Sequence, residues 1–321
     1  MEQFEQRIDL QKLETSVQRI RDQFTKLIVG QKQLVDLLLT SILADGHVLL
    51  EGAPGVAKTL SAKVLAKSLA TGFSRIQFTP DLMPSDVIGT SVFNQKDLSF
   101  EFKKGPVFSN IVLIDEVNRA PAKTQSALFE VMEEKQVTVD GVSHVLDNPF
   151  LIIATQNPIE QEGTYRLPEA QLDRFLMKVE VDYPNEDDEL NILQIAQSGK
   201  AQLDQVEAIL SESEIKELRA IVEQVKVDEK LLAYIAKIVS KTRNNKALFV
   251  GASPRASLAL LKASKAFAAL QGRDFVIPED IIELTEPILK HRIGLSPEKE
   301  MEGVDEQQFI QQLVKSVEIP R

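Results

Sequence analysis

The chain of 321 residues contains no cysteine and only three histidines. Without cysteine it can form neither a disulfide bond nor a thiolate metal site, and the composition suits a reducing compartment. The histidines, His47, His144 and His291, lie far apart in the sequence, so no histidine metal site can be argued.

Basic residues are also in the minority. Lys and Arg number 37 against 48 Asp and Glu, which gives a net charge of -11. A molecule with this charge repels nucleic-acid backbones unless a local basic patch overrides the total, so nucleic acid is not an expected partner. The length is sufficient for two domains with a buried core.

Long apolar runs and targeting signals are absent as well. No apolar run approaches about 18 residues, and the first seven residues lack the basic-then-apolar plan of a signal peptide. We therefore expect a cytoplasmic protein that does not insert into a membrane.

The segment Gly52–Thr59 has the composition of a phosphate-binding loop. It follows the apolar run Val48–Leu50, expected as a buried strand, and precedes a helical pattern over residues 60–70. In such a loop, backbone N–H groups and the helix N-terminus face the phosphates, Lys58 reaches the β- and γ-phosphates, and the Thr59 hydroxyl can bind Mg²⁺. A glycine-bearing turn with an exposed lysine is the simpler alternative, and we favour the nucleotide site.

One position of this loop departs from the pattern G-x-x-x-x-G-K-[ST]. Ala57 stands where the second glycine is expected. The position lies where the loop enters the helix, so we expect it to need only right-handed helical dihedral angles, which alanine adopts well.

A carboxylate pair ends the next long apolar run. Asp115 and Glu116 follow Ile111–Ile114, which is typical of a central strand covered on both faces. At the carboxyl end of such a strand, Asp115 would hold Mg²⁺ and Glu116 would orient or deprotonate the attacking water. Acidic pairs also occur as solvated strand ends, but the combination with Lys58 and Thr59 favours catalysis.

Two further polar side chains lie at strand ends. Asn157 follows the apolar run 150–154, where its amide could position the water or sense the γ-phosphate; a turn-forming Asn-Pro is an equal alternative. Arg174 lies at the end of an expected helix, 167–175, where it meets a last strand, 177–181. This places it on the far side from the phosphate loop, where it could reach a neighbouring subunit's nucleotide.

Other segments complete the expected architecture. Hairpins are predicted over 90–103 and 136–145, and Asp140-Gly141 is a tight-turn signal. An amphipathic helix is expected within 5–28, followed by a Gly30 turn and a helix over 32–44. Helices are also predicted at 187–198, 213–226, 228–242, 253–271, 279–291 and 304–316. Ser253 and Pro254 cap one of them, which places Arg255 in its first turn, where it could close on ATP or simply lie at the surface.

The order of these segments resembles an AAA+ ATPase of the MoxR family. The resemblance covers roughly residues 29 to 294 and rests on Val29–Gln31, Gly52–Thr59, Asp115–Glu116, Thr155–Pro158, Leu172–Phe175 and Ser253–Arg255. The stretches Asp115–Ala120 and Ala154–Phe175 are its most specific parts. Arg166 departs from it, since proline is expected between Tyr165 and Leu167.

The resemblance implies an α/β fold. Residues 1–184 would form a P-loop AAA+ αβα core with a parallel five-stranded sheet and two hairpin insertions, and residues 185–321 a smaller all-helical lid. The implied nucleotide-binding residues are Val29, Gly30, Gln31, Gly52, Ala53, Pro54, Gly55, Val56, Ala57, Lys58, Thr59 and Leu60. Thr59 and Asp115 would hold Mg²⁺. The implied catalytic residues are Lys58, Glu116, Asn157 as first sensor, Arg174 as a finger reaching across a ring interface, and Arg255 as second sensor from the lid.

The implied function is MgATP hydrolysis by a homo-oligomeric ring, a hexamer, that remodels or activates a client or adaptor protein. The client could carry a von Willebrand factor A domain or a metal cofactor. A nucleic-acid motor is the alternative, because related AAA+ helicases carry hairpins in the same two places. Residues 134–149, however, hold Glu134, Asp140 and Asp147 beside Lys135 and His144. A nucleotide-dependent scaffold is a third class, against which the intact Glu116 argues.

Overall fold

A computed structural model of the whole chain describes residues 8–157, 165, 167–198 and 203–320. Arg166, the departure from the family pattern, lies outside the described residues, as does most of the segment between Asn157 and Leu167.

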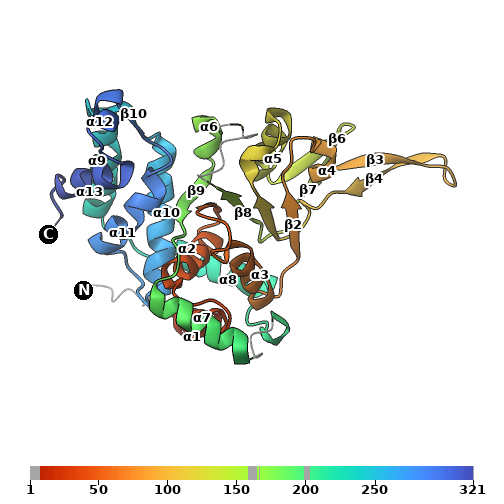
Figure 1. Ribbon diagram of the computed structural model, residues 1–321, viewed down its shortest axis with the longest axis horizontal. Coiled ribbons are helices and arrows are strands. Elements are labelled where there is room, and N and C mark those ends of the chain that lie inside the picture. Colours follow the sequence, from red (N-terminus) through yellow and green to blue (C-terminus); the bar gives the residue numbers. More distant parts are fainter. Residues whose placement is uncertain (1–7, 158–164, 166, 199–202, 321) are drawn as a thin grey trace, which may run out of the picture.

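A five-stranded parallel sheet forms the centre of the molecule (Figure 1). Its order is β2-β5-β8-β1-β9, with β1 at His47–Glu51, β2 at Phe73–Gln77, β5 at Ile111–Asp115, β8 at Leu151–Gln156 and β9 at Phe175–Glu180. Because all five strands are parallel, their carboxyl ends meet at one edge, which is where ligands bind in open α/β sheets. The expected five-stranded sheet is confirmed.

Helices cover both faces of this sheet. Alternate side chains point to opposite faces, so Val48 and Leu50 join one hydrophobic cluster and Leu49 the other. The helices of this part of the chain are α1 (Gln11–Thr25), α2 (Lys32–Leu43), α3 (Lys58–Ser68), α4 (Pro84–Ile88), α5 (Ala122–Glu134), α6 (Glu169–Leu172) and the 3₁₀ turn η1 (Val117–Arg119). The first four residues of β5 and of β8 are all apolar, because both faces of these strands are buried.

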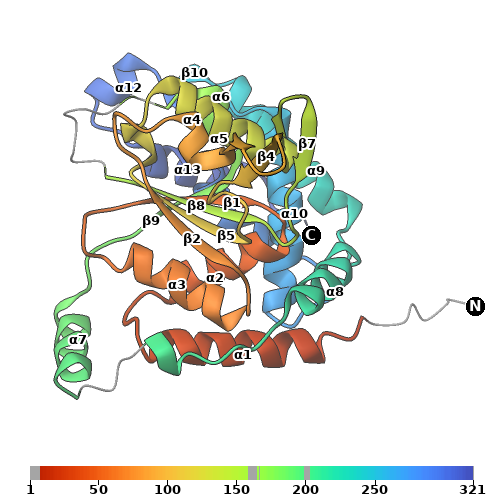
Figure 2. The same cartoon turned by 90° about the vertical axis from the view of Figure 1, so that its right-hand side faces the viewer.

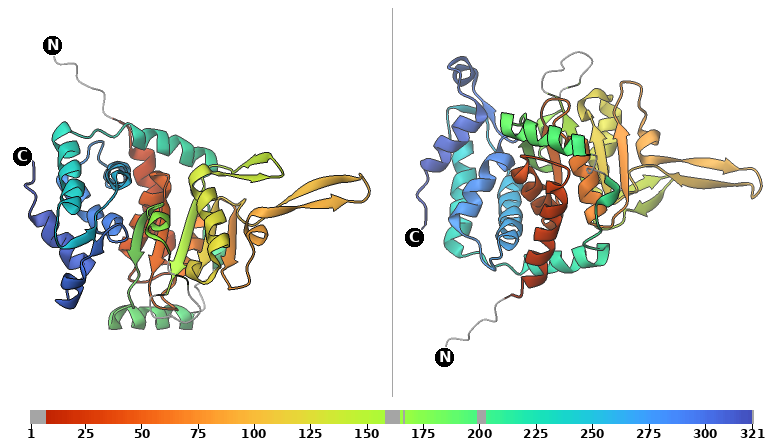
Figure 3. Two further views of the ribbon diagram at one scale, coloured as in Figure 1. Left: turned by 90° about the horizontal axis from the view of Figure 1, so that it is seen from above. Right: turned by 60° about the horizontal axis from the view of Figure 1, so that its bottom comes forward.

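Two hairpins extend from the core, as expected. The long one pairs β3 (Gly89–Asn94) with β4 (Ser99–Lys104) and projects well beyond the body of the molecule (Figures 1 and 3). The short one pairs β6 (Gln136–Val139) with β7 (Val142–Val145) around the Asp140-Gly141 turn. The Phe102 ring stacks on His144 with centroids 4.2 Å apart, so the two hairpins touch at their bases.

The remaining chain is mainly helical. It comprises α7 (Glu186–Ser198), the 3₁₀ turn η2 (Leu203–Gln205), α8 (Glu212–Glu223), α9 (Glu229–Arg243), α10 (Pro254–Leu270), α11 (Pro278–Leu289), α12 (Pro297–Met301) and α13 (Glu306–Lys315). Side chains of Ser211 and Ser253 cap α8 and α10. The helices α8 to α11 and α13 share one hydrophobic cluster with α1, α2 and α3, so this part packs directly on one layer of the core (Figure 2).

The structure differs from the sequence-based expectation in a few places. A two-stranded ribbon of β10 (Leu248–Val250) and β11 (Gly294–Leu295) interrupts the expected all-helical part, and the short helix α12 was not expected. The helix expected over 167–175 is reduced to the four residues of α6, and β9 begins at Phe175. Among the described residues, none of the helices combines the length and apolarity needed to span a membrane.

Candidate functional site

The loop between β1 and α3 has the backbone of a phosphate cradle. Gly52 passes so close to β9 that an added Cβ would lie 2.4 Å from the carbonyl oxygen of Val181. Gly55 has φ of +90°, a backbone conformation that residues with a side chain rarely adopt. The loop then enters α3 at Lys58, so the helix N-terminus points along the loop toward any bound anion.

Ala57 corrects one expectation. Its φ of 62° and ψ of 16° are left-handed, whereas we expected right-handed helical angles. The residue is the N-cap of α3, a position outside the helix, and the tight turn into the helix requires positive φ there. This explains why glycine is the usual residue in the pattern, and why alanine adopts the position only with strain.

Lys58 lies at the end of this loop with its amino group turned toward backbone carbonyls. Nζ donates to the oxygen of Gly52 at 2.5 Å and to that of Gln156 at 3.3 Å. Burial lowers the pKa of Lys58, opposed by the negative charges of Asp115, Glu116 and Glu51. The amine therefore lies within the phosphate loop, between the ends of β1 and β8.

Asp115 is buried at the carboxyl end of β5. Its Oδ2 accepts from Arg75 Nε at 2.6 Å, and its Oδ1 accepts from the Thr155 hydroxyl at 3.3 Å. Strand pairing explains both contacts, because Arg75 lies on neighbouring β2 and Thr155 on neighbouring β8. The carboxylate is therefore held from two sides.

Glu116 follows β5 with φ of 58°, again left-handed. Its Oε2 accepts from Gln77 Nε2 at 2.7 Å and lies 3.1 Å from Arg119 Nε. Its backbone N–H donates to the Thr155 hydroxyl at 3.0 Å. Thr155 thus contacts both residues of the carboxylate pair.

These groups surround one cavity of about 380 Å³ at the carboxyl edge of the sheet. Its lining residues are Pro54, Gly55, Ala57, Lys58, Thr59, Leu60, Arg75, Gln77, Asp115, Glu116, Thr155, Gln156 and Asn157. The Thr59 hydroxyl and Asp115 carboxylate are the hard oxygen ligands that Mg²⁺ prefers, and the loop N–H groups and Lys58 suit phosphate. The residues present therefore fit a magnesium nucleotide.

The remaining predicted nucleotide-binding residues are not among those that line this cavity. Ala53 and Val56 are buried in the loop, where they support it. Gly30 has φ of 76°, and an added Cβ would lie 2.4 Å from a carboxylate oxygen of Asp188 on α7. Gln31 Nε2 donates to the Asp182 carbonyl at 3.2 Å. The turn Val29–Gln31 therefore lies against the segment that follows β9.

Arg174 and Arg255 lie at the opposite edge of the sheet from Lys58. Arg174 immediately precedes β9, whereas Lys58 follows β1, its parallel neighbour. The five residues of β1 alone span about 13 Å. One chain therefore cannot bring Arg174 and Lys58 to the same phosphate group without rearranging its sheet.

A single carboxylate holds both arginines. Glu133, at the end of α5, lies 2.6 Å from Arg174 NH1 through Oε2 and 2.5 Å from Arg255 NH2 through Oε1. Arg174 NH1 also donates to the Phe129 carbonyl at 2.5 Å. The expected lid arginine, Arg255, thus lies beside the expected finger and not at the phosphate loop of its own chain.

The residue before Arg174 anchors this arrangement. The Asp173 carboxylate accepts from the Ser253 hydroxyl at 2.8 Å and from Arg292 Nε at 2.7 Å. Arg292 is buried and also donates to the Phe175 carbonyl at 2.5 Å. Because Ser253 caps α10 two residues before Arg255, these contacts fix both arginines relative to β9.

Sequence reasoning missed four residues of these sites. Arg75 and Gln77 are two residues apart on β2, so their side chains point to the same face of the sheet. This spacing indicates a role at the site only once β2 is known to lie beside β5. Thr155 was expected only as part of the motif Thr155–Pro158, without a contact of its own. Glu133 gave no local signal, because its contacts come from residues 41 and 122 positions away in the chain.

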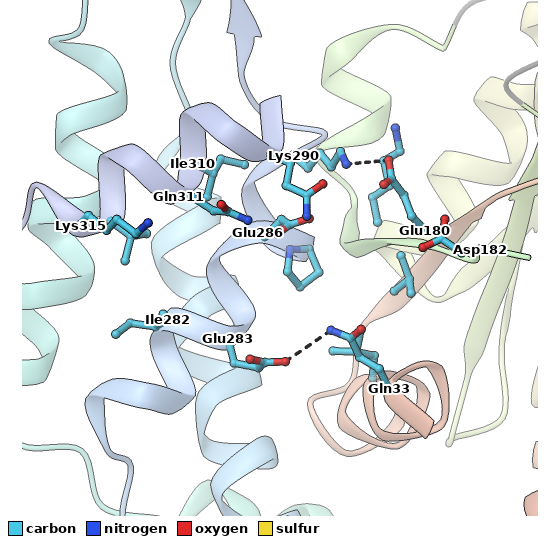
Figure 4. Close-up of a pocket in the computed structure, with 16 residues that line it drawn as sticks. Gln33, Glu180, Asp182, Ile282, Glu283, Glu286, Lys290, Ile310, Gln311 and Lys315 are labelled. Atoms are coloured by element: carbon cyan, nitrogen blue, oxygen red, sulfur yellow. Dashed lines mark hydrogen bonds and ion pairs between the residues drawn. The ribbon is translucent and has the colours of Figure 1, made fainter. Parts of the chain in front are cut away.

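A second cavity, of about 390 Å³, lies between β9 and the helices α2, α11 and α13 (Figure 4). Two contacts cross it: Lys290 lies 2.7 Å from Glu180, and Gln33 Nε2 donates to Glu283 at 3.4 Å. It contains none of the predicted site residues, and its contacts join the helical part to the edge strand.

Comparison with known proteins agrees with this architecture. Residues 47–177 match the model of the ATPase family associated with various cellular activities (AAA), and residues 240–313 match that of the AAA lid domain. The crystal structure of a protein assigned as an ATPase from Cytophaga hutchinsonii superposes with a TM-score of 0.89 at 46% identity over 97% of both chains.

Two curated relatives span most of the chain. The uncharacterized protein YeaC of Bacillus subtilis is 46% identical over 93% of both chains. The chaperone MoxR1 of Mycobacterium tuberculosis is 44% identical over 92% of this chain and 80% of its own. With the phosphate loop, the carboxylate pair and the helical part in place, the chain belongs to the MoxR family of AAA+ ATPases.

Proposed function

We propose that the protein hydrolyses MgATP at the interfaces of a homo-oligomeric ring, a hexamer, with each site built from two subunits. The observation that carries this proposal is the placement of Arg174 and Arg255 at the edge of the sheet opposite Lys58 and Glu116. In a head-to-tail ring, that edge of one subunit can face the phosphate loop of the next.

The proposed roles are supported by the positions of these residues around one cavity. Lys58 and the loop N–H groups bind the phosphates, while Thr59 and Asp115 hold the metal. Glu116 accepts the proton of the attacking water, and Asn157 orients that water. A bound Mg²⁺ neutralises phosphate charge and orients the leaving group. Each residue lines the same cavity.

Arg174 and Arg255 would act on the nucleotide of the neighbouring subunit. Arginine fingers contribute about 10³–10⁵-fold in rate, because a fixed guanidinium offsets charge in the transition state. In this chain both guanidinium groups lie on Glu133, so they would have to leave it to reach a phosphate. A monomer should therefore be a poor ATPase.

We further propose that hydrolysis drives remodelling or activation of a client or adaptor protein in the cytoplasm, for which a protein with a von Willebrand factor A domain or a metal cofactor is a candidate. The chaperone named among the relatives supports this class. The division into a core, 1–184, and a lid, 185–321, is part of the same proposal. The alternative is a nucleic-acid motor, against which the acidic residues around the β6–β7 hairpin argue.

Steady-state ATP hydrolysis by the purified protein tests this proposal. We expect Lys58→Ala and Glu116→Gln each to abolish turnover, and Glu116→Gln to retain ATP binding. Double-stranded and single-stranded DNA should leave turnover unchanged, whereas a client recovered with the Glu116→Gln variant should stimulate it. Turnover that depends on DNA would favour the motor, and turnover that survives Glu116→Gln would overturn the assignment of the site.

A further inference from the structure

The helix α7 is largely exposed, because few other side chains of the chain cover it. None of residues 186–197, the part of α7 whose side chains are described, is buried, and Leu190 and Leu193 are 54% and 67% exposed. Figure 2 shows α7 standing apart from the body of the molecule. A helix of this length is marginal in water without tertiary packing, so a surface that covers its apolar side would stabilise it.

This helix lies beside the nucleotide cavity. Its Asp188 approaches Gly30, and the segment that leads into it passes Gly52 and accepts a hydrogen bond from Gln31. It therefore stands at the carboxyl edge of the sheet, next to the phosphate loop. A neighbouring subunit that brings arginines to this edge must pass close to α7.

The face that carries those arginines has basic side chains, which α7 lacks. On α10, Arg255, Leu258 and Lys262 are spaced at three and four residues, line one side of the helix and are exposed. Leu258 is 59% exposed. This face joins a cavity of about 300 Å³ that also contains Arg174 and Arg292.

The two surfaces match in chemistry and in length. The first turn of α7 is acidic at all of Glu186, Asp187, Asp188 and Glu189, and is followed by Leu190 and Leu193. The stretch from Glu186 to Leu193 and that from Arg255 to Lys262 each cover seven steps of helix, about 10 Å. Two copies that each carry a net charge of -11 repel one another overall, and patches of opposite charge favour their association in this orientation.

We infer that α7 of one subunit packs against the α10 face of the next, with its acidic turn beside Arg255 and Lys262 and its leucines against Leu258. This inference rests on the proposed ring with shared sites. It makes α7 a docking element for a second copy of this chain. The same contact would order α7 and position the neighbour's arginines at the nucleotide.

The absence of cysteine permits a direct test by crosslinking. A Leu193→Cys chain and a size-tagged Leu258→Cys chain would be mixed in the presence of ATP and treated with a flexible bis-maleimide. We expect a covalent heterodimer at several times the yield obtained when Leu232→Cys replaces Leu258→Cys. Leu232 is a matched control because it is 42% exposed on α9.

A second variant tests the energetic role of α7. We expect Leu193→Asp to raise the protein concentration needed for assembly by about tenfold or more, because it introduces a charge into an apolar contact. Leu232→Asp should leave assembly unchanged.

Three outcomes would overturn the inference: crosslinking no better than the Leu232→Cys control in an assembled ring, Leu193→Cys chains that crosslink only to each other, or a Leu193→Asp variant that assembles normally and loses only stimulation by a client. In each case Arg174→Ala would still abolish turnover if the shared site is correct. Normal turnover in an Arg174→Ala variant would instead contradict the proposal that the active site is shared between subunits.

Discussion

The guanidinium of Arg75 lies against the carboxylate of Asp115, with Nε 2.6 Å from Oδ2. Asp115 is the residue proposed to hold Mg²⁺, and a positive charge at this distance disfavours a bound cation. We predict that Arg75→Met lowers the Mg²⁺ concentration for half-maximal ATP hydrolysis by about three- to tenfold. A magnesium titration at saturating ATP measures this. Lys103→Met, which removes a charge from the exposed hairpin, should leave the Mg²⁺ requirement unchanged. A higher Mg²⁺ requirement in Arg75→Met would contradict the prediction and would show instead that Arg75 positions Asp115 for binding the metal.

Glu133 should restrain the two arginines that it binds. Glu133→Gln keeps the shape of the side chain but removes the charge that competes with phosphate for Arg174 and Arg255. We predict that kcat rises by about three- to tenfold. The unfolding free energy should change by less than about 1 kcal/mol, because the ion pairs are partly solvated. A fall in kcat at unchanged stability would show that Glu133 orients the arginines for catalysis.

The left-handed backbone at Ala57 predicts an unusual gain from glycine. Ala57→Gly should raise the unfolding free energy by about 1 kcal/mol, because glycine adopts positive φ without the steric cost that alanine has. Urea denaturation followed by circular dichroism measures the change. Ala236→Gly, at an exposed position within α9, should instead lower it by about 1 kcal/mol. A loss of stability in both variants would contradict the strained geometry.

Buried histidines predict a loss of stability toward acid. Burial lowers the pKa of His47 to about 4, from an ordinary value near 6.5. Below about pH 6.5 His47 is protonated in the unfolded chain but stays neutral in the folded chain until the pH approaches 4. The unfolding free energy therefore falls as the pH falls, by about 3 kcal/mol in total at pH 4. Unfolding measured from about pH 7 to about pH 5 should show this slope, and His47→Gln should reduce it. His291, also buried with a lowered pKa, would account for part of what remains.

The sequence was most informative where one local pattern decides the structure. Apolar runs located β1, β5 and β8, and the helix expected over 32–44 agrees with α2. The Asp140-Gly141 turn and the cap at Ser253 were also recognisable, because backbone conformation there depends on the residues themselves. The cavity residues Lys58, Thr59, Asp115, Glu116 and Asn157 could be grouped because parallel strands share one carboxyl edge.

Contacts between distant segments could not be predicted in the same way. Glu133 meets Arg174 and Arg255 only because α5, β9 and α10 converge, and nothing near Glu133 in the sequence specifies this. The positive φ of Ala57 was misjudged because its position was assigned to the first turn of α3 and not to the cap before it. The exposure of α7 depends on how the rest of the chain packs around it, and the local sequence of α7 does not specify that packing.

The central claim is that one subunit supplies the phosphate-loop side of each active site and its neighbour supplies Arg174. Mixing two inactive variants tests it most directly. Glu116→Gln retains Arg174, and Arg174→Ala retains Glu116, so a mixed ring contains interfaces with both residues intact. At equal amounts, random assembly predicts recovery of about a quarter of wild-type turnover. Turnover that stays at the level of the separate variants, although mixed rings form, would contradict the account.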